Sequence, residues 1–62
     1  MLEELIKISK NNKGKQLSQK DSERCQILIQ NCENDLELNN WLNCPKIHPK
    51  IRHFILRRFL EI

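Results

Sequence analysis

The stretch PKIRHFILRRFLEI, residues 49–62, is the most apolar and the most basic part of the chain. It predicts a helix that begins at Pro49, because a proline at the first helical position gives up only an N–H that would have no partner there. On a wheel of about 100° per residue, the narrow polar stripe of this helix consists of Lys50, His53, Arg57 and Glu61. Apolar side chains cover most of the remaining circumference. We therefore expect this helix to be the centre of the fold or part of an oligomer interface.

Two arginines, Arg52 and Arg58, interrupt the apolar arc of the same helix. Arginine can lay its aliphatic stem along apolar surface while its guanidinium reaches water. We expect both side chains to do this.

The composition of the chain predicts an all-α fold. The 62 residues contain no Ala, Val, Thr or Tyr and only one Gly, and strand-forming residues beyond Ile, Phe and Trp are missing. A chain of this length buries only about 60% of its unfolded surface, so its stability margin is thin. We expect one domain, residues 1–62, built as a small bundle of three or four short antiparallel helices.

Residues 2–10 predict a first short helix, with Leu2, Leu5, Ile6 and Ile8 as its apolar face. The sequence NNKGKQ, residues 11–16, has no apolar side chain and predicts a loop. Ser18 then caps a second helix, and Asp21, three residues later, forms a variant of the capping box. Leu17 precedes the cap as a hydrophobic staple.

The middle of the chain allows two interpretations. An apolar stripe with helical spacing comprises Cys25, Leu28, Ile29, Cys32 and Leu36, so one helix can run over residues 19–43. Alternatively the helix breaks at residues 31–34, and Asn34 caps a separate helix whose apolar face is Leu38, Trp41 and Leu42. The Asn-rich run has modest helix propensity, which favours the break. Residues 43–48 predict a turn, in which Ile47 fills the core between two prolines.

Charge is distributed unevenly along the chain. Residues 1–16 have a net charge of +2, residues 17–44 of −3 and residues 45–62 of +4. The basic segments suggest phosphate contacts with nucleic acid. The alternative is that the acidic middle packs beside the basic helix. For nucleic acid, the candidate residues at the C-terminal end are Lys46, Lys50, Arg52, His53, Arg57 and Arg58, and the N-terminal lysines are Lys7, Lys10, Lys13, Lys15 and Lys20.

Few residues suit catalysis or metal binding. Cys44, His48 and His53 lie close in sequence, and Cys32 could complete a zinc site, but the paired-cysteine knuckle of zinc modules is missing. A Cys–His nucleophile pair needs an oxyanion pocket, for which a chain of this size has little room. We expect no catalytic residues, no metal, no cofactor and no enzymatic activity. Three cysteines and the lack of a long apolar run predict a cytoplasmic protein without a membrane partner.

Binding to another protein is the function that the sequence favours. A short chain with a surplus of large apolar residues often completes its core with a partner. Trp41, Phe54, Phe59 and Arg58 are the candidate partner-binding residues, because aromatic residues and arginine dominate binding hot spots. The alternative is that the aromatic residues belong to the core. We predict a small adaptor or regulator that binds a protein partner or itself as a homo-oligomer; a small nucleic-acid-binding protein is the second hypothesis.

Overall fold

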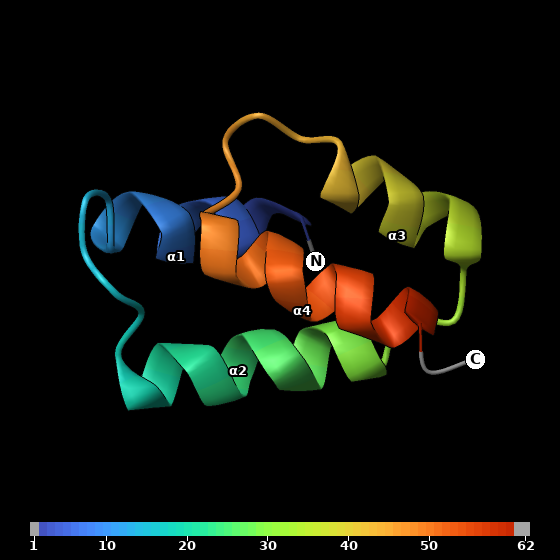
Figure 1. Cartoon of the computed structure of the whole chain (residues 1–62), viewed down its shortest axis with the longest axis horizontal. Helices are drawn as coiled ribbons and strands as arrows, with labels where there is room; N and C mark the ends of the chain where they lie inside the picture. The colour runs from blue at the N-terminus through green and yellow to red at the C-terminus, as the bar shows by residue number, and fades with distance from the viewer. Residues whose placement is uncertain (1, 61–62) are drawn as a thin grey trace.

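Four helices make up the computed structural model, which describes residues 2–60 (Figure 1). They are α1 Leu2–Asn11, α2 Gln19–Gln30, α3 Asp35–Leu42 and α4 Pro49–Leu60. Successive helices alternate in direction, and α4 runs lengthwise through the middle of the view, packed against both α2 and α3 (Figure 1). The predicted all-α bundle is confirmed. Helix α4 begins at Pro49 as predicted, whereas Glu61 and Ile62 lie outside the described residues.

Two helices begin at side-chain caps that the sequence predicts. Ser18 has extended backbone angles, and its Oγ accepts a hydrogen bond from the Asp21 amide at 3.2 Å. Asn34 does the same for α3, because its Oδ1 accepts from the Glu37 amide at 3.1 Å. Such bonds satisfy backbone donors that have no partner inside the helix. The cap at Asn34 confirms that the middle of the chain breaks into two helices.

The core gathers apolar side chains from all four helices and from the turn before α4. Its buried members are Leu5, Ile8, Cys25, Ile29, Cys32, Leu38, Trp41, Ile47, Ile51 and Ile55. Ile47 fills the core as predicted. Leu36 does not belong to the predicted stripe of α2: it is 72% exposed, because the new helix begins at Asp35 and rotates its side chain outward.

Polar side chains fasten α1 to its neighbours. Ser9 is buried, and its Oγ donates to the Leu5 carbonyl at 2.7 Å and accepts from the His48 amide at 2.9 Å. The Asn12 side chain, also buried, donates to the Ile8 carbonyl at 2.8 Å and to the Asp21 carboxylate at 2.9 Å. These bonds join the end of α1 to the start of α2 and to the start of α4.

The loop between α1 and α2 turns at the only glycine of the chain. Gly14 has a φ of +72°, a conformation that side-chain-bearing residues rarely adopt. A Cβ placed there would meet no atom within 4 Å, so the backbone angle alone accounts for the glycine.

Replacing Ser9 by Ala should lower the free energy of unfolding by about 1–3 kcal/mol, because the His48 amide would lose its acceptor in a partly buried position. Urea denaturation followed by circular dichroism measures the loss. Ser22→Ala is the matched control, since the Ser22 hydroxyl accepts only an exposed bond from Gln26. Equal stability of the two variants would show that the Ser9 bond contributes little.

Candidate functional site

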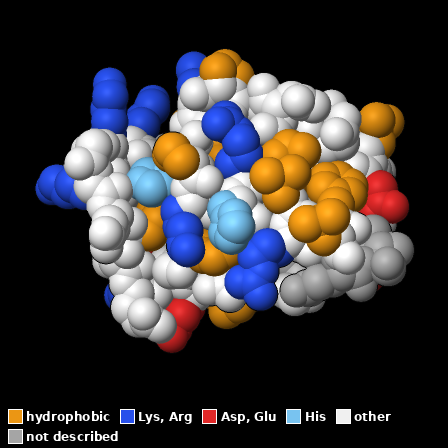
Figure 2. Space-filling view, in the orientation of Figure 1, with side chains coloured by type: hydrophobic (Ala, Val, Ile, Leu, Met, Phe, Trp, Pro, Cys, Tyr) orange, Lys and Arg blue, Asp and Glu red, His pale blue; other side chains and the backbone are white. Residues whose placement is uncertain are grey.

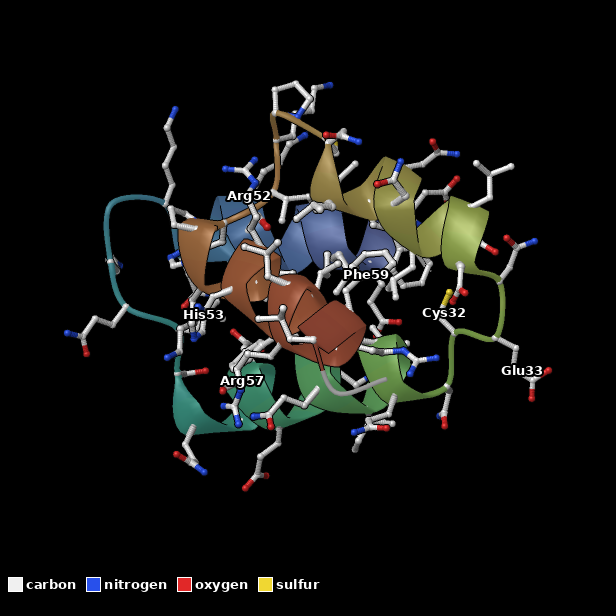
Figure 3. The ribbon with its side chains drawn as sticks, turned by 45° about the vertical axis from the view of Figure 1, so that its right-hand side comes forward. Cys32, Glu33, Arg52, His53, Arg57 and Phe59 are labelled. Carbon is white, nitrogen blue, oxygen red and sulfur yellow. The ribbon has the colours of Figure 1, made fainter. Side chains whose placement is uncertain are left out.

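The two arginines on the flanks of α4 bind the ends of other helices. Arg52 donates from Nε to the Leu42 carbonyl at 3.2 Å and from Nη2 to the Cys44 carbonyl at 3.0 Å, at the end of α3 (Figure 3). A helix C-terminus leaves carbonyls unpaired and carries partial negative charge, so a guanidinium is a well-matched partner. The head of Arg52 therefore binds two backbone carbonyls, an interaction that the sequence does not predict.

Arg58 plays the same part at the end of α2. Its Nη2 donates to the Cys32 carbonyl, two residues beyond the last residue of α2, while its Nε is buried without a partner. The expected hydration of this guanidinium therefore does not extend to its Nε. Because both arginine heads are bound to the chain's own backbone, they offer little to a phosphate or to another protein.

The remaining surface of α4 is a continuous outward face. Its members are Lys50, His53, Leu56, Arg57 and Leu60, which we call the α4 face; all are exposed. Leu56 is 44% and Leu60 82% exposed, although the sequence predicts neither as surface. The two leucines form one edge, beside the basic edge of Lys50, His53 and Arg57. Figure 2 shows hydrophobic side chains gathered over the C-terminal half of α4, next to basic ones.

The three aromatic residues belong to the interior or to its border. Trp41 is only 4% exposed. Phe54 and Phe59 are partly buried and pack against the core, with Phe59 directed between the helices (Figure 3). The Lys50 ammonium lies 5.4 Å from the centre of the Phe54 ring, a cation–π contact at the rim of the α4 face. Among the predicted partner-binding residues, Phe54 thus contacts a member of the α4 face.

His48 caps α4 and ties it to the first loop. Its Nδ1 accepts from the Lys50 amide at 3.0 Å, and its Nε2 lies 2.7 Å from the Lys15 carbonyl. The neutral ring with its proton on Nε2 satisfies both partners, which fixes the tautomer. Both ring nitrogens are therefore occupied by backbone groups and neither faces a substrate or a metal.

No three Cys, His, Asp or Glu side chains within residues 2–60 come together as a possible metal site. The set drawn from the sequence, Cys32, Cys44, His48 and His53, is thus not assembled. Cys32 points its thiol toward the Asn34 carbonyl, 3.5 Å away, at the opposite end of the bundle from His48.

Cys25 is fully buried, and burial is the main reason why the pKa of its thiol rises to about 11. The negative charges of Asp21 and Glu4 add to this rise. A thiol with a raised pKa is a poor nucleophile at neutral pH, because only the thiolate reacts. Cys25 is therefore a core residue.

Opposite charges meet at the surface between α1 and α2. Arg24 Nε lies 2.8 Å from the Glu4 carboxylate, and this hydrogen bond is the main cause that lowers the pKa of Glu4. Lysines that are distant in sequence border one hollow: Lys10 from the end of α1, Lys13 and Lys15 from the first loop, and Lys46 from the turn before α4.

Within the described residues, no helix has the length and apolar character needed to cross a bilayer.

Comparisons with protein families, with curated proteins and with solved structures found no match to this sequence or fold. The site is therefore judged on its own geometry.

Replacing Arg52 by Met should cost about 1–3 kcal/mol of stability, because the Leu42 and Cys44 carbonyls would lose a charged donor while the aliphatic packing is kept. Thermal and urea unfolding measure the change. Lys46→Met, which removes the same charge from an exposed position, should leave the unfolding free energy within about 0.5 kcal/mol of the parent. A similar loss in both variants would contradict the role given to Arg52.

Cys25 should be the slowest thiol to react with iodoacetamide at pH 8, and Cys44, which is partly exposed, the fastest. Unfolding in urea should raise the rate at Cys25 by about two orders of magnitude or more, because it restores an ordinary thiol pKa. The stabilising effect of keeping this thiol neutral is complete below about pH 9 and is lost as the pH rises toward the folded-state pKa of about 11. Equal labelling in folded and unfolded protein, read by mass spectrometry, would contradict this.

Proposed function

We propose that the protein is a non-enzymatic adaptor whose α4 face binds a partner protein that presents acidic residues beside an apolar strip. The observation that carries the proposal is the pair of exposed leucines, Leu56 and Leu60, next to the basic edge of the same helix. Burying a leucine side chain is worth about 1.5–3 kcal/mol, so two adjacent ones can anchor a small interface.

Packing and hydrogen bonds hold the helix that carries the α4 face in a fixed position. On the opposite side of the helix Ile51 and Ile55 are fully buried, and Arg52 and Arg58 fix its flanks to the ends of α3 and α2. A partner therefore meets side chains on a helix that is already held in place, which lowers the ordering cost of association.

Charge selects the kind of partner. The sequence of α4, PKIRHFILRRFL, contains no Asp or Glu, so its outward face carries only basic charge. In a symmetric dimer through this face, two basic edges would lie close together, and like charges across an interface oppose association. An acidic partner avoids this cost. Self-association, the other form of the adaptor hypothesis, is an outcome that the experiment below distinguishes.

Nucleic-acid binding is the second candidate, and the gathering of lysines at one end of the bundle favours it. Because Arg52 and Arg58 are bound to backbone carbonyls, phosphate contacts at this end of the chain would fall mainly on Lys46, Lys50 and His53. Such binding would be governed by charge, would weaken steeply with salt and would carry little sequence preference.

The three free cysteines fit a reducing compartment, and we accordingly propose a cytoplasmic protein. We also propose that it has no catalytic activity of its own. The occupied ring of His48 and the protonated thiol of Cys25 support this.

A helical peptide with leucines at positions i and i+4 and flanking glutamates should bind the protein, and a twin peptide with lysines in place of the glutamates should not. Fluorescence anisotropy measures both affinities. Leu56→Asp with Leu60→Asp should weaken the acidic peptide at least 10-fold. Leu36→Asp, at an exposed leucine of α3, should weaken it less than 2-fold.

Two results would overturn the proposal. One is equal binding of the acidic and basic peptides, or binding that is insensitive to the double leucine variant. The other is a dimer, seen by light scattering of the protein alone, that Leu56→Asp with Leu60→Asp converts to a monomer. The occupant of the α4 face would then be a second copy of the chain.

A further inference from the structure

We propose that the hollow between the α1–α2 loop and the turn before α4 binds a small molecule that carries phosphate groups. The hollow has a volume of about 690 Å³, within the range of small-ligand sites. Its lining consists of Ser9, Lys10, Lys13, Gly14, Lys15, Gln16, Pro45, Lys46, Ile47, His48 and Pro49. We call it the lysine hollow. This proposal is independent of the α4 face.

The charged residues that line the lysine hollow are all basic. Lys10, Lys13, Lys15 and Lys46 line the hollow, and no Asp or Glu is among its lining residues. A concave surface lined by charge of one sign concentrates its field and attracts counter-charged ligands. Lysine ammonium groups bind phosphate as flexible point charges, so several of them can adapt to one multiply charged ligand.

The other lining residues of the lysine hollow are uncharged, and some of them are apolar. Its lining also includes the exposed prolines Pro45 and Pro49, which contribute apolar surface, together with the buried Ile47 and Ser9 and the partly buried His48. A ligand made only of phosphate would leave this apolar part unused. The combination fits a molecule with two or more phosphates on a flat or apolar body, as in a nucleoside diphosphate.

The two walls of the hollow are held in place by hydrogen bonds. His48 binds the Lys15 carbonyl through Nε2 at 2.7 Å and the Ser9 hydroxyl through its own amide at 2.9 Å. The loop and the turn are therefore fixed to each other before any ligand arrives, which lowers the ordering cost of binding.

The arrangement around His48 and Lys15 also bears on the size of the ligand. A second, smaller hollow of about 370 Å³, lined by Lys50 among others, shares Lys15, Gln16 and His48 with the first. His48 and Lys15, which are joined by a hydrogen bond, therefore line both hollows. Single-stranded nucleic acid is usually held in a continuous groove with aromatic side chains for its bases. Two separate hollows without a Phe, Tyr or Trp in their lining favour a compact ligand.

The experiment titrates the whole chain, labelled with ¹⁵N, with ADP and separately with pyrophosphate, at low and at physiological salt. We expect saturable shifts at the amides of Ser9, Gly14 and Ile47, tighter binding of ADP than of pyrophosphate, and weakening with salt. Lys13→Glu with Lys46→Glu should weaken ADP binding at least 10-fold. Lys7→Glu with Lys20→Glu changes the net charge equally but lies outside the lining, and should weaken it less than 2-fold.

Three outcomes would overturn the proposal. The first is the absence of saturable shifts with either phosphate compound. The second is an equal loss in the Lys7 and Lys20 control, which would mean that only net charge matters. The third is tight binding of a 12-residue single-stranded oligonucleotide, abolished by Lys13→Glu with Lys46→Glu, without binding of ADP. In that case the lysines would serve a nucleic-acid backbone.

Discussion

The unpaired backbone groups at helix ends are the constraint on which this small structure depends. Four short helices have many ends for their length, and each end leaves amides or carbonyls without an intrahelical partner. Side chains satisfy them at almost every junction: Ser18 and Asn34 cap their own helices, whereas His48 and Arg52 bring distant parts of the chain together as they do so. The polar groups that complete the helices therefore also assemble the bundle, in a chain whose apolar core alone is small.

The sequence predicts those features of this fold that depend on interactions between residues close together in the chain. The caps at Ser18 and Asn34 act over three residues, so composition and spacing suffice to place them. The helix at Pro49 and the buried Ile47 follow from proline geometry and apolar spacing in the same way. The roles of Ser9 and Arg58 could not be predicted, since their partners lie 39 and 26 residues away and only the packed structure brings them into reach.

The candidate surfaces show the same limit. An apolar helix read in isolation does not reveal which arc its neighbours will cover, so Leu56 and Leu60 could not be distinguished from the buried Ile51 and Ile55. Nor does the sequence show that the lysines of the first loop and Lys46 border one hollow. The charge pattern indicated basic segments correctly, but it could not show that Arg52 and Arg58 bind backbone carbonyls while Lys13, Lys15 and Lys46 are exposed.

The hydrogen bonds of His48 have a consequence for how the molecule forms. Its partners, Ser9 and Lys15, lie 39 and 33 residues earlier, and the main packing of α2 and α3 is against α4. On the ribosome, α1 to α3 therefore emerge without the helix that covers their apolar faces, and stable folding has to wait until α4 has been synthesised. During that interval the nascent chain exposes the apolar side chains of its future core to water.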